Sequence, residues 1–264
     1  MENLREINRD GGSPKLFTRL DSDKKPPKKI FALGEFDDEL FERPSVAIVG
    51  SRKATDYGRE VTLKFARELA ERGVVVVSGL AIGVDSFAAQ GGLAGGGTTI
   101  AVLGNSLPAI YPAQNREIAA EILAGQGAIF SEYEPGTPTF PNNFLARNRL
   151  ISALADIVIV VEGNLKSGSL NTAKHAREQG KILMAVPGNI TSPLSSGPND
   201  LLARGAFPAI SSAGVIRKLR EKYPDFVFDA KKNPARKSAK KSPENPATRA
   251  VLEILAQKPA TTDE

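Results

Sequence analysis

The sequence predicts an α/β fold in which a mainly parallel β-sheet is covered by helices on both faces. Short, continuous runs of Val and Ile recur along the chain, and each is followed by a segment in which apolar residues have helical spacing. Strands that are apolar along their whole length are typical of sheets buried on both faces. With 264 residues, of which 41% are hydrophobic, the chain can bury one such core with modest appendages.

The first two predicted strands are SVAIVG at 45–50 and VVVVSG at 74–79. A helix is expected between them over 57–72. Asp56 is its expected N-cap, because a carboxylate there can accept hydrogen bonds from the unpaired N–H groups of the first turn. After the second strand, LAIGVD leads into another helix, which is expected to be capped near Asp85.

The third and fourth predicted strands are TTIAVLG at 98–104 and GAIFSE at 127–132. A proline-containing loop and a helix over about 114–123 connect them. A long proline-rich loop then leads to a helix within residues 140–154.

That helix carries an arginine in its apolar stripe. Phe144, Ile151 and Leu154 mark one helical face, and the spacing places Arg147 on the same face. A buried, unpaired guanidinium near the positive end of a helix dipole is costly, so a negative group is expected beside Arg147. This group is either a bound phosphate or one of the acidic residues at strand ends, which are Glu132, Glu134 and Glu162.

The fifth predicted strand, at 156–162, is followed by a loop and helix over 166–180. The sixth strand is ILMAVPG at 182–188. A short helix near 198–204 and a helix over roughly 212–222 complete the predicted core.

Three domains are predicted: an N-terminal extension at 1–44, an α/β core at 45–222 and a C-terminal tail at 223–264. The extension is polar and is expected to be loosely ordered. In the tail, the basic linker KKNPARKSAKK at 231–241 contains six basic and no acidic residues. One amphipathic helix follows at about 247–257. It cannot bury its own apolar face, so it is either part of a truncated small domain or a docking element.

Composition excludes several kinds of site. The absence of cysteine excludes disulfides, thiolate metal sites and a cysteine nucleophile, and it suits a reducing cytoplasm. His175 is the single histidine, which excludes a histidine-rich metal site and argues against a Ser-His-Asp triad. It is interpreted as a solvated surface residue. We therefore predict no catalytic residue, no metal and no cofactor.

The charge and hydropathy of the chain narrow its partners. No apolar run approaches the roughly 18 residues of a membrane span, and the amino terminus does not have the form of a signal peptide. The net charge is +5, and the predicted core holds 18 basic and 14 acidic residues. The core is therefore only mildly basic, and any anion site in it must arise from a local concentration of positive charge.

Four unusual loops are expected at the carboxyl ends of the strands, where open α/β sheets bind ligands. They are 50–52, 78–85, the start of the helix within 140–154, and 166–172. Their backbone N–H groups and hydroxyls can form an anion-binding crevice. The cationic side chains expected around it are Arg52, Arg147, Arg149 and Lys166.

Each of these signals also has a plainer structural interpretation. The alternative role of Gly79 and Gly83 is solely to allow close packing of a helix on a strand. Phe140 and Phe144 are either core residues or platforms on which bases stack. The convergence of four loops favours phosphate binding over the separate interpretations.

Five motifs, in this order and spacing, resemble the central domain of the DNA-processing protein A (DprA, or Smf) family. They are VAIVGSRKATDYG, VVSGLAIGVDSFAA, FPNNFLARNRLISALAD, VVVEGNLKSGSLNTA and AVPGNITSPLSSGPNDLLARGA, and they cover roughly residues 45–210. The resemblance implies an extended Rossmann-like fold that binds single-stranded DNA, forms dimers, and helps to load a RecA-type recombinase during natural transformation. It also implies that the tail is a truncated winged helix.

The resemblance assigns DNA- and phosphate-binding roles by position. Arginine and lysine would hold phosphates, and hydroxyls and amides would fix the register of the strand. The predicted DNA- and phosphate-binding residues are Gly50, Ser51, Arg52, Ser78, Gly79, Gly83, Phe140, Phe144, Arg147, Asn148, Arg149, Lys166, Ser167, Gly168, Ser169 and Thr172. Five further positions match family motifs without an assigned binding role: Asp85, Pro187, Gly188, Gly197 and Asn199.

The alternative is a nucleotide-binding module or a nucleotide-phosphate hydrolase of the same fold. A related group of phosphoribohydrolases has a glycine-rich loop followed by a catalytic glutamate. In the comparable stretch here, SGSLNTAKH, Lys174 and His175 stand where acidic residues would be needed. The general acid or base is therefore missing from its expected place.

Overall fold

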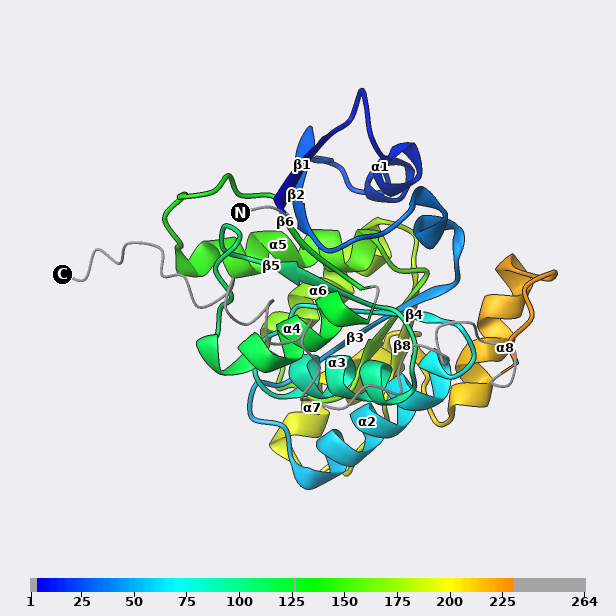
Figure 1. Cartoon of the computed structure of the whole chain (residues 1–264). Coiled ribbons are helices and arrows are strands. Elements are labelled where there is room, and N and C mark those ends of the chain that lie inside the picture. Colours follow the sequence, from blue (N-terminus) through cyan, green and yellow to red (C-terminus); the bar gives the residue numbers. More distant parts are fainter. Residues whose placement is uncertain (1–3, 126, 230–264) are drawn as a thin grey trace.

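A nine-stranded sheet runs through the computed structural model, which describes residues 4–125 and 127–229 (Figure 1). Its strand order is β1-β2-β6-β5-β4-β3-β7-β8-β9. All neighbours from β6 to β9 in this order are parallel, whereas β2 is antiparallel to β6 and β1 is antiparallel to β2. The strands are β1 (Leu4–Asn8), β2 (Lys29–Leu33), β3 (Ser45–Val49), β4 (Val75–Ser78), β5 (Thr99–Leu103), β6 (Ala128–Ser131), β7 (Ile157–Val160), β8 (Ile182–Ala185) and β9 (Phe207–Pro208).

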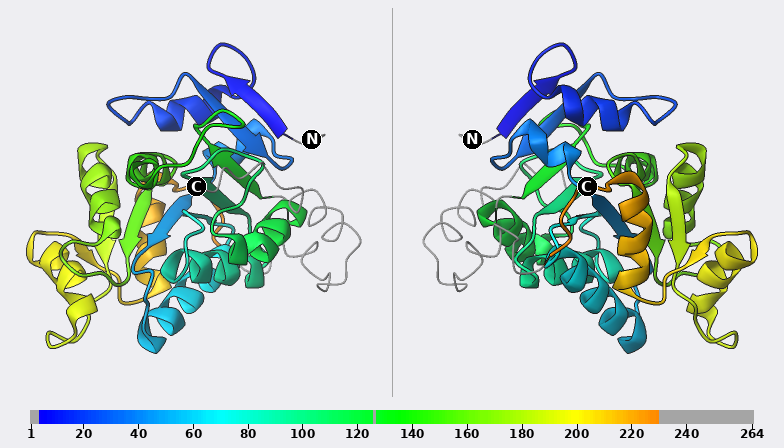
Figure 2. Two further views of the ribbon diagram at one scale, coloured as in Figure 1. Left: turned by 90° about the vertical axis from the view of Figure 1, so that its left-hand side faces the viewer. Right: turned by 90° about the vertical axis from the view of Figure 1, so that its right-hand side faces the viewer.

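Two layers of helices cover opposite faces of the sheet (Figures 1 and 2). One layer contains α1 (Pro14–Leu20), α5 (Pro141–Ala153), α6 (Gly168–Glu178) and α7 (Ser196–Ala203). The other contains α2 (Asp56–Ala70), α3 (Val84–Ala94), α4 (Arg116–Ala124) and α8 (Ser212–Lys222). Short 3₁₀ helices are η1 (Asp38–Glu42), η2 (Ala113–Asn115) and η3 (Pro193–Ser195).

The central strands supply apolar side chains to both layers. In β3, Ala47 and Val49 pack into the cluster with α5 and α6, whereas Val46 and Ile48 pack against α2, α3 and α8. This alternation follows from the two-residue period of a strand, and it explains why the strand sequences are apolar throughout. The six predicted strands and the mainly parallel, doubly covered sheet are confirmed.

The expectation that the N-terminal extension is loosely ordered is wrong. Strand β2 pairs with β6, β1 pairs with β2, and helix α1 buries Leu16, Phe17 and Leu20 in the core. The apolar residues of KLFTRL and KIFAL are the signal for these elements, but the many charged residues around them dilute it.

The predicted cap of α2 is also wrong, whereas α3 begins near Asp85 as predicted. Thr55, not Asp56, is the N-cap of α2, and its hydroxyl accepts a hydrogen bond from the Gly58 N–H at 3.2 Å. Gly83 is the N-cap of α3, and Asp85 lies inside its first turn. In both helices the acidic residue is in the first turn, where it still interacts favourably with the helix dipole.

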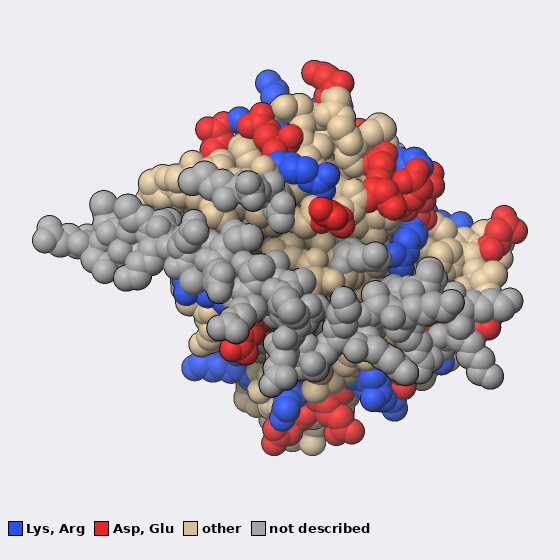
Figure 3. All heavy atoms as spheres, viewed as in Figure 1, with Lys and Arg blue, Asp and Glu red and all other residues tan. Residues whose placement is uncertain are grey.

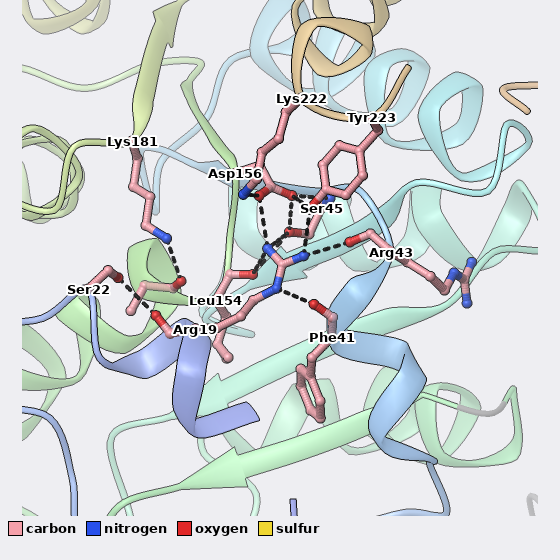
Figure 4. A network of polar contacts seen from close by, with 11 residues as sticks. Arg19, Ser22, Phe41, Arg43, Ser45, Leu154, Asp156, Lys181, Lys222 and Tyr223 are labelled. Carbon is pink, nitrogen blue, oxygen red and sulfur yellow. Dashed lines mark hydrogen bonds and ion pairs between the residues drawn. The ribbon is translucent and has the colours of Figure 1, made fainter. Parts of the chain in front are cut away.

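A buried polar network at the amino end of β7 ties distant segments to the sheet (Figure 4). Asp156 forms ion pairs with Arg19 of the α1 helix at 3.0 Å and with Lys222 of α8 at 2.6 Å. It also accepts hydrogen bonds from the Tyr223 hydroxyl at 3.0 Å and the Ser45 N–H at 2.9 Å. Burial alone would raise the pKa of Asp156, but Arg19 and Lys222 outweigh burial, so the pKa lies below its usual value.

In the part of the chain that the structure describes, no helix is long and apolar enough to cross a bilayer. The predicted basic linker at 231–241 and the helix after it lie outside the described residues. The predicted division into three domains stays a prediction, although the extension and the core contribute strands to one sheet.

Candidate functional site

A crevice of about 480 Å³ opens at the carboxyl ends of the central strands. Strand β3 lies between β4 and β7, so the chain leaves β3 toward one side of the sheet and later continues on the other. Open α/β sheets bind ligands at such a switch in strand order. The walls come from the turn after β3, the start of α3, the exposed side of α5, and the loop that leads into α6.

Eleven of the predicted site residues line this crevice, and five do not. Those that line it are Gly50, Ser51, Arg52, Phe144, Arg147, Asn148, Lys166, Ser167, Gly168, Ser169 and Thr172. Those outside its lining are Ser78, Gly79, Gly83, Phe140 and Arg149.

Sequence reasoning assigned no role at the crevice to several further lining residues. Lys53 adds a cation directly after the Gly-Ser-Arg turn, and its place next to that motif was an available signal. Asn164 and Leu194 reach the crevice from loops that the sequence pattern does not bring together. The apolar residues Val49, Ala81, Pro141, Leu145 and Ile151 complete this set.

Arg147 is a buried structural residue as well as part of the crevice wall. Its side chain is 5% exposed, and its Nη1 donates hydrogen bonds to the carbonyl oxygens of Gly79, at 2.8 Å, and Val102. These bonds connect α5 to the ends of β4 and β5. Burial lowers the pKa of Arg147 to about 10, while the neighbouring Asp85 carboxylate acts in the opposite direction.

The negative partner of Arg147 is Asp85, and none of the three suggested glutamates holds this place. Glu132 pairs with Arg149, and Glu134 pairs with Lys29. Glu162 accepts hydrogen bonds from the N–H of Thr55 at 2.9 Å and from its hydroxyl at 2.6 Å. The need for a negative neighbour was predicted correctly, whereas the suggested glutamates are wrong, and a phosphate beside Arg147 stays a prediction.

Asp85 and Arg147 hold one peptide unit from its two sides. The Gly79 N–H donates to Asp85 Oδ2 at 3.1 Å, and the Gly79 carbonyl accepts from Arg147. A Cβ atom at Gly79 would lie 2.5 Å from Asp85 Oδ2 and 2.7 Å from Arg147 Nη2. Glycine is therefore required at this position by close packing within the protein.

The second motif, at 78–85, packs against the Gly-Ser-Arg turn of the first motif. Gly83 has a φ of +82°, and a Cβ there would lie 2.3 Å from the Ser51 carbonyl oxygen. The Val84 N–H donates to that same oxygen at 3.1 Å. The interpretation of Gly79 and Gly83 as close-packing positions is confirmed, and this packing fixes the Gly-Ser-Arg turn at the crevice.

Arg149 is not brought to the crevice. Its guanidinium donates to Asp23 at 2.7 Å and to the Lys25 carbonyl at 3.0 Å, and it forms an ion pair with Glu132. It thus connects α5 to the N-terminal segment, which the sequence prediction treated as separate. Ser78 is likewise occupied, since its hydroxyl donates to the Ile48 carbonyl at 2.9 Å.

Among helices α2, α3 and α6, α6 presents the N-terminus most open to an anion. Glu162 already binds the N-terminal residues of α2, and Asp85 lies in the first turn of α3. The first turn of α6 contains no acidic residue, and its N-cap is Ser167, whose hydroxyl accepts from the Ser169 N–H at 3.3 Å. Because Lys166 directly precedes this cap, dipole and side-chain charge have the same sign here.

Exposed cations surround this helix end. Arg52, Lys53 and Lys166 are exposed side chains that line the crevice. Among the described residues, Asp85 is the only acidic side chain in the lining. On the face shown in Figure 3, by contrast, basic and acidic side chains are interspersed where described residues form the surface. Positive charge is therefore concentrated in the crevice.

Aromatic rings border the crevice along α5. The Phe144 ring is half-buried, lies 5.3 Å from the Tyr111 ring between centroids, and has the Arg52 guanidinium 6.0 Å from its centre. Phe140, the N-cap of α5, is 59% exposed, and Tyr111 is 57% exposed. The interpretation of Phe140 as a core residue is therefore wrong.

Residues of the last of the five motifs hold loops that adjoin the crevice. Asn199 binds the Gly188 backbone from both sides, accepting from its N–H at 3.2 Å and donating to its carbonyl at 3.0 Å. The Gly197 N–H donates to the Gly163 carbonyl at 2.9 Å. These contacts position the loop after β7.

His175, on α6, is partly buried, and burial lowers its pKa, in contrast to the predicted solvated residue.

Comparison with known proteins gives a consistent result. Residues 8–220 match the family described as DNA recombination-mediator protein A. The chain is 40% identical to Protein Smf of Escherichia coli over 194 residues, which are 74% of this chain and 51% of that protein. It is 37% identical to the DNA processing protein DprA of Bacillus subtilis over 202 residues, which are 76% and 67% of the two chains.

Two solved structures share the fold. DNA processing protein A from Helicobacter pylori, described for its single-stranded DNA binding mode, matches with a TM-score of 0.72 and 36% identity over 83% of this chain and 96% of that chain. DprA from Streptococcus pneumoniae matches with a TM-score of 0.73 and 34% identity over 81% and 74%. The chain spans about half the length of the curated relatives from E. coli and Mycobacterium tuberculosis.

Proposed function

Because the chain belongs to the DNA recombination-mediator protein A (DprA/Smf) family, whose members process DNA, we propose that its crevice binds single-stranded DNA. The observation that carries the proposal is the grouping of exposed Arg52, Lys53 and Lys166 around the open N-terminus of α6. This arrangement suits phosphates of a flexible strand. The aromatic side chains along α5, Phe140 and Phe144, suit unstacked bases.

The proposal divides the crevice residues by role. Arg52, Lys53 and Lys166 hold phosphates, and the N–H groups of Gly50, Ser51 and Gly168 donate to the same oxygens. Asn148 and Thr172 line the floor. Arg147 shapes this floor and acts on the strand only through the charge that it adds to the crevice.

Within the same proposal the protein is a binder and not an enzyme. In the part of the chain that the structure describes, the only carboxylate in the crevice is Asp85, and it is bound to the Gly79 N–H. A nucleotide-phosphate hydrolase needs a free general acid or base at the ligand. Assaying nucleoside monophosphates for release of free base tests this alternative, and turnover abolished by Asp85→Asn would support it.

The wider role proposed is that of a homodimer that protects incoming strands and helps to load a RecA-type recombinase in the cytoplasm during natural transformation. A short crevice grips few nucleotides, so two crevices in one dimer would hold a strand more firmly through effective concentration. Loading would be tested by the rate at which the recombinase forms filaments on strands coated with single-strand-binding protein, with and without the protein.

The binding proposal is tested by fluorescence anisotropy with labelled oligo-dT and a duplex of equal length. Arg52→Ala and Lys166→Ala should each weaken binding to oligo-dT about tenfold in 0.1 M salt, because a charge-assisted contact contributes about 1.5–3 kcal/mol. The salt dependence of binding should fall by about one counterion per substitution. The duplex should bind more weakly than the single strand.

Matched controls are available on the other layer. Arg67 and Lys64 are exposed on α2, away from the crevice lining, so Arg67→Ala and Lys64→Ala should leave binding within twofold. If all four variants weaken binding equally, the interaction is a general effect of net charge and the crevice is not the site.

A further inference from the structure

Asp85 is an acidic side chain in a crevice that otherwise collects positive charge. It is 8% exposed, and it lines the crevice together with Arg52 and Arg147. A carboxylate here repels a phosphate that enters beside Arg52. Phosphate binding by itself does not call for a carboxylate at this place.

Internal contacts explain how the carboxylate is held. It accepts the Gly79 N–H at 3.1 Å, and the guanidinium of Arg147 binds the carbonyl of the same residue at 2.8 Å. The charged side chains that the described structure places against Asp85 are Arg147 from α5 and Arg52 from the turn after β3. Asp85 is therefore fixed in position, and Arg147 cannot move away without breaking its bonds to the carbonyl oxygens of Gly79 and Val102.

We propose that Asp85 is a positioning residue that couples strand binding to the uptake of a proton. Entry of a phosphate next to Arg52 disfavours the charged carboxylate, and protonation relieves the repulsion while the side chain stays in place. The proposal rests on the proposed function and deepens it, because it gives the crevice a dependence on pH.

The direction of the effect follows from linkage. Burial raises the pKa of Asp85 to about 6, against the opposing effects of Arg147 and the N–H groups of Ala81 and Gly79. A bound phosphate would raise it further. If this second shift is about one pKa unit, affinity for the strand falls about tenfold as pH rises from 5 to 8, because only the bound state keeps the proton.

The experiment measures the affinity of oligo-dT without a terminal phosphate between pH 5 and pH 8. Thymine does not titrate in this range, whereas a terminal phosphate does. Wild type should show the tenfold fall. Asp85→Asn should bind at pH 8 within about twofold of wild type at pH 5, and its affinity should not change with pH.

Two controls keep the result interpretable. His175 is partly buried and burial lowers its pKa, but it lies outside the crevice lining, so His175→Gln should retain the pH dependence of wild type. In addition, titration calorimetry of wild type at pH 6.5, in buffers with different ionisation enthalpies, should show uptake of about half a proton per bound strand. This second measurement needs no variant to fold.

The possible outcomes separate the two proposals. If wild type binds no strand at any pH, the proposed function fails. If it binds with no proton uptake, or if Asp85→Asn keeps the full pH dependence, strand binding stands and the role of Asp85 is wrong.

Discussion

At the scale of single residues, two arginines predicted to act alike have different surroundings. Arg52 is exposed at the crevice, whereas Arg147 is buried and holds the ends of two strands through carbonyl oxygens. The sequence pattern correctly predicts that Arg147 lies on the buried face of a helix and needs a negative neighbour. It cannot identify Asp85 as that neighbour, because helical spacing carries no information about which loop packs against the helix.

This difference predicts that the substitution of Arg147 destabilises the fold, whereas the substitution of Arg52 hardly changes its stability. Arg147→Ala should lower the free energy of unfolding by about 3 kcal/mol, because it leaves Asp85 and two buried carbonyl groups without their partner. Arg52→Ala should change it by less than about 0.5 kcal/mol. Urea denaturation followed by circular dichroism measures both. Equal stability of the two variants would show that Arg147 is not structural.

At the scale of elements, the strands and helices of the central sheet were predictable because each carries its own periodic pattern. The exceptions are elements whose stability comes from distant contacts. Strand β2 is ordered by pairing with β6, β1 by pairing with β2, and short β9 by pairing with β8. Likewise, apolar residues of a dimer surface cannot be told from core residues until the fold is known.

The family resemblance predicts a dimer surface at roughly 190–222, for which the apolar candidates are Phe207, Ile210, Val215, Ile216 and Leu219. Val215, Ile216 and Leu219 are buried in the core of their own chain, whereas Phe207 is 46% and Ile210 is 76% exposed. If this region forms the proposed dimer, Ile210→Asp should convert a dimer into a monomer in light scattering at micromolar concentration. The monomer should lose the preference of wild type for long oligo-dT over oligomers of about ten nucleotides. A variant that stays dimeric would place the interface elsewhere.

At the scale of the whole molecule, the sheet separates two kinds of polar site. The carboxyl ends of the strands carry the crevice, and the amino end of β7 carries the network around Asp156. The crevice motifs are contiguous in sequence, so the resemblance to a known family located them. The network joins single residues from separate segments, and therefore only the folded structure shows it.

The network also has a consequence for the order of folding. Its hydrogen bond between Arg19 and Tyr223 joins residues 204 positions apart, so it closes the longest loop among the polar contacts described above. Closing such a loop costs more conformational entropy than forming the local β–α units, so these contacts should form after the transition state. Asp156→Asn, which weakens two ion pairs, should then speed unfolding about tenfold and leave the folding rate nearly unchanged. Stopped-flow denaturant jumps measure both rates, and Asp200→Asn, which breaks an exposed pair with Arg204, is the matched control. A slower folding rate in Asp156→Asn would mean that α1 and α8 dock early. With the expected result, Asp156 governs how long both segments stay docked on the sheet once the molecule has folded.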